Sequence, residues 1–136
     1  MRFLFRKDKK DAKGYAALRH AAENGHLSII TWLNEEGVDY DAPDSNGLTA
    51  FSYAAEGGQI NVIQNFWNRE IRFDLRDLKD RTPLSYAAEC GHLEVAKKLL
   101  ERGADPMARN KEGKTPYSRS SSDAMSALLK GTYISQ

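Results

Sequence analysis

The stretch AAECGH at residues 87–92 determines how the rest of the chain is interpreted. Two similar stretches precede it, AAENGH at 21–26 and AAEGGQ at 54–59, and each begins 33 residues before the next. Four further blocks keep the same offset: DAKGYAAL at 11–18, DSNGLTAF at 44–51, DLKDRTPL at 77–84 and NKEGKTPY at 110–117. Blocks that stay in phase over four periods indicate an internal structural repeat.

The third repeat predicts two short helices joined by a tight turn. Thr82 is a residue type that caps helix starts, and Pro83 suits the first helical turn. Gly91 and Gly103 are expected to end the two helices. The apolar residues between these signals recur at helical spacing: Leu84, Ala87 and Ala88, then Leu93, Val95, Ala96, Leu99 and Leu100. Two helices this short cannot bury their apolar faces alone, so the units must stack.

On these residues the chain resembles the ankyrin repeat family. The resemblance is carried by the period and by three segments: RTPLSYAAECGHLEVAKKLLERGADP at 81–106, GLTAFSYAAEGGQINVIQNFW at 47–67 and GYAALRHAAENGHLSIITWLNEEGVD at 14–39. It implies an all-α solenoid of stacked helix–turn–helix units with finger loops on one side. The expected organisation is an N-terminal cap at 1–10, a repeat domain at 11–131 and a tail at 132–136, with repeats at 11–43, 44–76, 77–109 and a truncated 110–131.

Several positions depart from the family pattern. Asp80 stands where glycine is usual, and Glu70 replaces the glycine before the last loop of the second unit. The fourth unit lacks the AAxxGH block. Its segment SRSSSDAMSALLKG at 118–131 predicts a C-terminal cap whose apolar face carries Met125, Leu128 and Leu129.

Composition favours one soluble globular domain. Hydrophobic residues make up 40% and charged residues 29% of the 136 residues, a balance unlike that of disordered chains. The net charge of +1 gives no global attraction to nucleic acid or membrane. A single cysteine forms no internal disulfide, which favours a reducing compartment. We expect a cytoplasmic monomer, with secretion by a specialised system left open.

Glu89, Cys90 and His92 place a carboxylate, a thiol and an imidazole close together. Their counterparts in the other units are Glu23, Asn24 and His26, and Glu56, Gly57 and Gln59. Because a nucleophile would not recur as Asn and Gly, these are repeat positions, and a thiol or metal enzyme centred on Cys90 is the least favoured interpretation. The two histidines are expected to form hydrogen bonds in the turn. No catalytic residue, cofactor or metal is expected.

The resemblance implies binding of another protein, as adaptor, inhibitor or effector, through the concave groove and the fingers. The candidate binding residues follow the repeat on the first helices and the fingers: His20, Tyr53, Tyr86, Glu23, Glu56 and Glu89, then Tyr15, Leu48, Arg76, Lys79, Arg81, Arg109, Lys111 and Lys114. Tyr and Arg are enriched at interface hot spots. Removing Tyr53, Tyr86, Arg76 or Arg109 is expected to weaken binding with little loss of stability.

Blander interpretations of these rows stay open. The tyrosines can cover helix packing, the glutamates can form a solvated face, and the basic residues can be ordinary loop tips. Trp32 and Trp67 on the second helices are expected to pack rather than to stack on a ligand.

The N-terminal segment MRFLFRKDKKDAK at 1–13 allows a different function. Phe3, Leu4 and Phe5 are expected to cover the apolar flank of the first unit, which a solenoid needs. The alternative function is binding of acidic surfaces or nucleic acid through the basic fingers and the basic N-terminal residues Arg6, Lys7, Lys9 and Lys10. The first unit is acidic, which favours solubility or contact with a basic group: Glu35, Glu36, Asp39, Asp41 and Asp44.

Overall fold

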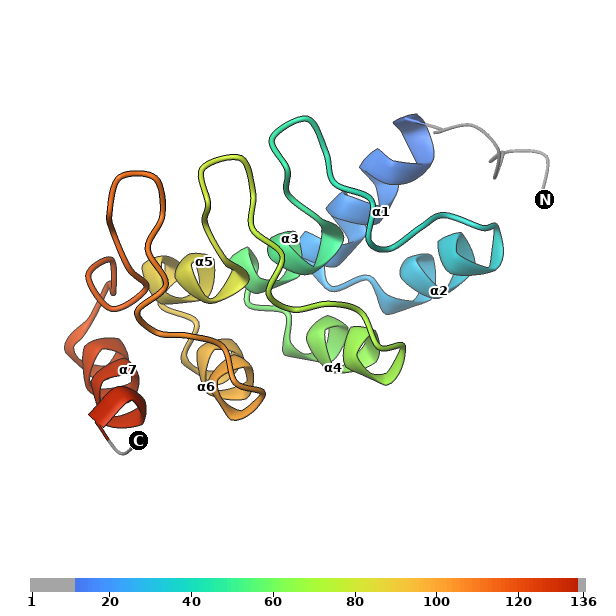
Figure 1. The fold of residues 1–136 in the computed structure, drawn as a ribbon. Coiled ribbons are helices and arrows are strands. Elements are labelled where there is room, and N and C mark those ends of the chain that lie inside the picture. The colour runs from blue at the N-terminus through green and yellow to red at the C-terminus, as the bar shows by residue number, and fades with distance from the viewer. Residues whose placement is uncertain (1–11, 135–136) are drawn as a thin grey trace.

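The computed structural model describes residues 12–134, which form a single stack of paired helices (Figure 1). The helices are α1 Ala12–Asn24, α2 Leu27–Glu35, α3 Ala50–Glu56, α4 Ile60–Asn68, α5 Pro83–Cys90, α6 Leu93–Glu101 and α7 Asp123–Ile134. Helices α1, α3 and α5 form one row, and α2, α4 and α6 form a second, outer row. Three loops rise on one side as fingers, defined here as finger one (44–49), finger two (77–82) and finger three (110–115).

Small side chains allow the inner row to pack closely. Helix α3 lies between α1 and α5. The paired alanines of the repeated motif are at most 1% exposed in all three helices: Ala21, Ala22, Ala54, Ala55, Ala87 and Ala88. Larger residues on the outer row complete the core, with Phe66 and Leu99 fully buried. The all-α stack therefore agrees with the fold expected from the repeat.

Threonines begin the inner helices as the sequence predicts. Thr49 Oγ1 accepts a hydrogen bond from the Ser52 N–H at 3.4 Å, and Thr82 Oγ1 accepts one from the Ser85 N–H at 3.3 Å. Each bond satisfies an amide that the helix itself leaves unpaired. The starting signal is thus read in the same way in the second and third units.

The fourth unit has this threonine but no inner helix. Thr115 Oγ1 accepts from the Ser118 N–H at 3.0 Å, after which the chain turns and enters α7 at Asp123. Helix α7 packs against α6, and its Met125 and Leu129 are fully buried. The segment closes the C-terminal end of the stack, and α7 continues to Ile134, beyond the expected boundary at 131.

Glu70 and Asp80 keep the backbone geometry of the glycines that they replace. Both have φ of 59°, in the left-handed region. The equivalent glycines have the same sign, for example Gly103 at 97° and Gly47 at 82°. A side chain in this region costs roughly 1–2 kcal/mol. The repeat geometry therefore persists at both substituted positions.

Two further observations bound the fold. None of the helices in residues 12–134 is long and apolar enough to cross a membrane. The expected N-terminal cap of Phe3, Leu4 and Phe5 lies outside the described residues, as do the basic residues Arg6, Lys7, Lys9 and Lys10.

Candidate interaction groove

A groove of about 370 Å³ separates finger one from finger two, beside α3 and α5. It brings together the following residues: Asn46, Leu48, Tyr53, Glu56, Asp77, Leu78, Lys79, Arg81 and Tyr86. Most of these are candidates from the sequence, but Asn46, Asp77 and Leu78 are not. Leu78 is the most exposed large apolar side chain of the described residues, at 62%.

Finger two is held in shape by one buried carboxylate. Asp77 Oδ1 accepts hydrogen bonds from the N–H groups of Lys79 and Arg81, both at 2.9 Å. Asp77 Oδ2 accepts from the Tyr86 hydroxyl on α5. The carboxylate therefore fixes the turn of the finger and fastens the finger to the helix beneath it.

The other fingers repeat this device. In finger one, Asp44 accepts from the N–H groups of Asn46 and Leu48 at 2.8 and 2.9 Å, and from the Tyr53 hydroxyl. In finger three, Asn110 Oδ1 accepts from the N–H groups of Glu112 and Lys114 at 2.8 and 2.9 Å. The walls of the groove are thus built before any partner arrives.

The tyrosines of the groove have structural roles. Tyr86 is only 8% exposed, and burial, followed by the hydrogen bond to Asp77, raises the pKa of its hydroxyl far above the usual value. Burial and the bond to Asp44 raise the pKa of Tyr53 to about 12. The structure contradicts the expectation that these residues can be removed with little loss of stability, because each joins a helix to its finger.

Arg76 is likewise engaged within the stack. Its Nη1 donates to the carbonyl oxygens of Arg109 at 2.8 Å and Asp80 at 3.3 Å. Removing Arg76 would therefore loosen the base of finger three, again contrary to the expectation of intact stability. Backbone bonds also connect the fingers, since Leu78 N–H donates to the Asn46 carbonyl at 3.0 Å.

The glutamate row has three different environments. Burial raises the pKa of Glu56, and the charges of Glu23 and Glu89 raise it further. Glu89 forms an ion pair with Arg119, with an Nη2–Oε1 distance of 2.6 Å. Arg81 lies on the opposite side of this groove, with its guanidinium 5.7 Å from the centre of the Tyr86 ring.

Other candidates lie away from the groove. In the first unit, Tyr15 is half-buried against the core, whereas His20 and Glu23 are exposed. On the side of finger three, three basic residues are exposed: Arg109, Lys111 and Lys114. The structure thus does not join all candidate residues into one surface.

The two motif histidines behave differently. His92 Nε2 donates to the Glu56 carbonyl oxygen of the preceding unit at 2.8 Å, and Gln59 Nε2 makes the same bond to the Glu23 carbonyl at 3.0 Å. His26 lies 6.3 Å from the His20 ring, measured between centroids. The expected bond within the turn is therefore replaced, at His92, by a bond between units.

Trp32 and Trp67 differ in exposure. Trp32 is 40% exposed, whereas Trp67 is half-buried beneath Arg102, whose guanidinium carbon lies 4.6 Å from the ring centre. Trp67 agrees with the expected packing role.

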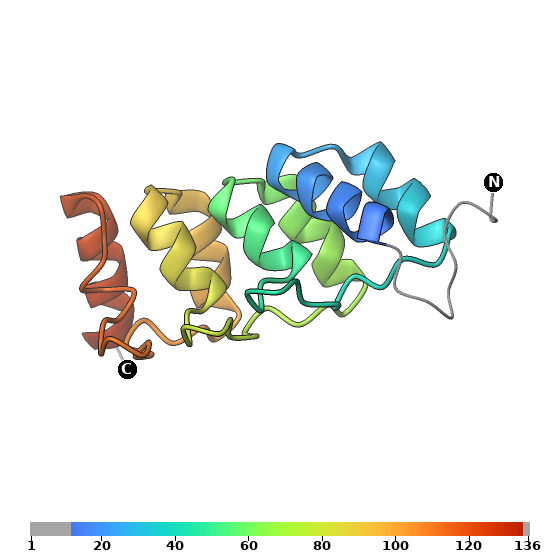
Figure 2. The same cartoon turned by 90° about the horizontal axis from the view of Figure 1, so that it is seen from above.

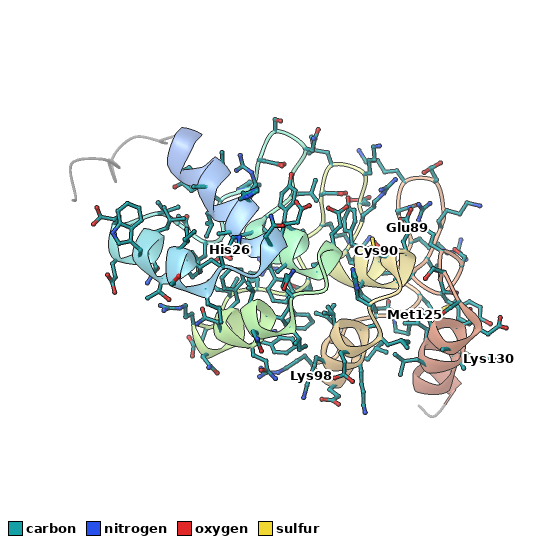
Figure 3. The ribbon with its side chains drawn as sticks, turned by 180° about the vertical axis from the view of Figure 1, so that it is seen from behind. His26, Glu89, Cys90, Lys98, Met125 and Lys130 are labelled. Atoms are coloured by element: carbon teal, nitrogen blue, oxygen red, sulfur yellow. The ribbon has the colours of Figure 1, made fainter. Side chains whose placement is uncertain are left out.

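Cys90 is exposed at the end of α5, beside Glu89 (Figure 3). Burial of the thiol raises its pKa above the usual value, and the charges of Glu56 and Glu89 raise it further. A raised pKa leaves less thiolate at neutral pH. Among residues 12–134, no group of three or more His, Cys, Asp or Glu side chains is arranged to hold a metal ion.

The raised pKa predicts slow alkylation of Cys90. At pH 7.5 we expect iodoacetamide to react about threefold or more slowly than with free cysteine, because the reactive thiolate is depleted. Glu56→Gln with Glu89→Gln should accelerate the reaction, whereas Glu101→Gln on α6 serves as a distant control. Alkylation as fast as that of free cysteine, measured by intact-mass spectrometry, would show that the carboxylates do not suppress the thiolate.

Comparison with known proteins agrees with this architecture. A family model of ankyrin repeats, described as three copies, matches residues 18–110. No curated protein sequence matches the chain. Ankyrin repeats are generally modules for protein–protein interaction and are generally non-enzymatic. Because the match spans more than half of its residues, the chain belongs to the ankyrin repeat family.

Proposed function

We propose that this protein binds a partner protein in the groove between finger one and finger two, without catalysing a reaction on it. The observation that carries the proposal is an exposed leucine at a groove with prefixed walls. Leu78 is 62% exposed, although its own N–H is bonded to finger one. Covering most of this side chain contributes about 1–2 kcal/mol to binding.

Preorganisation adds to the case for this surface. Association normally costs free energy because loops and side chains must be ordered at the interface. Here the carboxylates of Asp44 and Asp77 already order the two fingers. The groove also offers both signs of charge, with Lys79 and Arg81 on the finger and Glu56 on α3. A partner segment that combines an apolar side chain with charged groups matches this surface.

The proposal is specific to binding and treats adaptor, inhibitor and effector as roles of one surface. A solenoid is a scaffold, so the partner determines which role applies.

A capture experiment with two matched variants tests the proposal. The baits are the native chain, Leu78→Asp in the groove, and Leu93→Asp at the start of α6, where Leu93 is 41% exposed. Both variants place the same charge on an exposed leucine, and an acidic residue is tolerated at a helix start. We expect a protein that the native chain and Leu93→Asp retain from native lysate and that Leu78→Asp loses.

Circular dichroism establishes that each bait is folded. A partner retained equally by all three baits would place the interface outside the groove.

A further inference from the structure

The first unit exposes an apolar position that the later units bury. Ile29 on α2 is equivalent at the 33-residue period to Val62 on α4 and Val95 on α6. Both valines are 0% exposed, whereas Ile29 is 44% exposed. Units two and three each have a unit before them, and the first unit has none. The position therefore faces the side on which a preceding unit would lie.

A tryptophan enlarges this surface. Trp32 is 40% exposed and follows Ile29 by three residues, so the two lie on one face of α2. The equivalent residues of α4 and α6 are the polar Asn65 and Lys98. The first unit thus presents more apolar surface at this end than its repeat position requires.

The other end of the stack shows how this chain covers such a surface. Helix α7 takes the place of a following unit and buries Met125 and Leu129. At the N-terminal end, α1 begins at Ala12 on the same side of the stack as the end of α2 (Figure 2). Eleven residues precede this point.

The length and apolar content of residues 1–11 fit this surface. When extended, 11 residues reach about 36 Å, whereas α2, with nine residues, is about 14 Å long. The segment MRFLFRKDKKD contains the apolar run Phe3-Leu4-Phe5. It therefore has both the reach and the side chains to cover Ile29 and Trp32.

The charges are also complementary. The segment has five Lys or Arg against two Asp, a net charge of +3. The end of α2 and the loop after it carry acidic residues: Glu35, Glu36, Asp39 and Asp41. The C-terminal end of a helix adds partial negative charge. Burial raises the pKa of the Asp41 carboxyl and the charge of Asp39 raises it further, so a nearby cation would be favourable.

We propose that residues 1–11 cover the outer side of the first unit, with Phe3, Leu4 and Phe5 against Ile29 and Trp32 and the basic residues beside the acidic loop. In this role the segment replaces a preceding repeat, as α7 replaces a following one. Its apolar contact resists salt and its ionic contact weakens with salt.

Deletion of residues 2–11 tests the contact directly. In ¹⁵N-labelled protein we expect the deletion to shift the amide signals of Ile29 and residues 35–41 and the indole signal of Trp32, while signals of α5 and α6 stay in place. We also expect the unfolding midpoint to fall by about 3–6 °C. An unchanged midpoint, with shifts confined to the residues beside the cut, would overturn the proposal.

Two receiving-side variants make the test specific. If the segment rests on Ile29, Ile29→Ser should reduce the effect of the deletion on the midpoint by half or more, because contacting residues are coupled. Leu93→Ser, at a similarly exposed leucine, should leave the effect of the deletion unchanged. Equal effects in both backgrounds would contradict the contact. A concentration-dependent doubling of mass in sedimentation that Ile29→Ser abolishes would assign the surface to a second copy and also overturn the proposal.

Discussion

Ala87→Asp is expected to lower the free energy of unfolding by more than about 4 kcal/mol and to abolish the folded third unit. Ala87 is 0% exposed on α5, which packs against both α3 and α6. A carboxylate there has no room and no cationic partner, and it would lose its hydration. Urea unfolding followed by circular dichroism measures the effect.

Ala127→Asp is the matched control for this change. Ala127 lies within α7 and is exposed, so the same substitution changes helix propensity without burying a charge. We expect a loss of at most about 1 kcal/mol. Similar urea midpoints for the two variants would contradict the close packing of the inner helices.

Asp77→Ala is expected to cost about 3 kcal/mol and to loosen finger two. The substitution removes the acceptor of two finger amides and of the Tyr86 hydroxyl, which is itself buried. Leaving buried donors unpaired costs more than the net value of the bonds. Urea unfolding gives the stability, and amide hydrogen exchange of Lys79 and Arg81 reports on the finger.

Asp77→Asn separates the hydrogen bonds from the side-chain volume. Asn110 already holds the equivalent two amides in finger three, so asparagine suits this turn. The expected loss is about 1 kcal/mol, with finger amides still protected. If Asn and Ala at position 77 were equally destabilising, the turn would not depend on the Oδ1 acceptor.

The repeat and the helix boundaries could be predicted because they depend on local chemistry. Thr82, Pro83 and Gly91 act within one turn of the chain, and the structure shows each in the expected role. The alanine pairs are recognisable because only small residues allow neighbouring helices to approach closely. Stacking followed from these signals, because isolated helix pairs leave their apolar faces exposed.

The contacts that shape the groove carried weaker signals. Tyr86 and Asp77 are nine residues apart, and their types alone do not tell whether the hydroxyl faces a partner or the finger. The acceptor for His92 is a backbone carbonyl, which has no residue identity in a sequence. Leu78 did leave a signal, because the equivalent finger positions are the polar Ser45 and Lys111.

Arg119 was missed because the fourth unit breaks the repeat. Its inner helix is absent, so residues 118–121 follow a path that the period does not describe. That path brings the guanidinium to Glu89 and the Ser121 hydroxyl to the Ala88 carbonyl. Periodic reasoning therefore succeeds where a unit has neighbours like itself and fails at the ends of the stack.

The most direct test of the groove is the dissociation constant of the captured protein, measured by isothermal titration calorimetry. The native chain, Leu78→Asp and Leu93→Asp are compared at one salt concentration. Binding through the groove predicts that Leu78→Asp weakens affinity by about tenfold or more, equal to about 1.4 kcal/mol, while Leu93→Asp stays within about twofold of native. Equal dissociation constants for Leu78→Asp and the native chain would contradict the account.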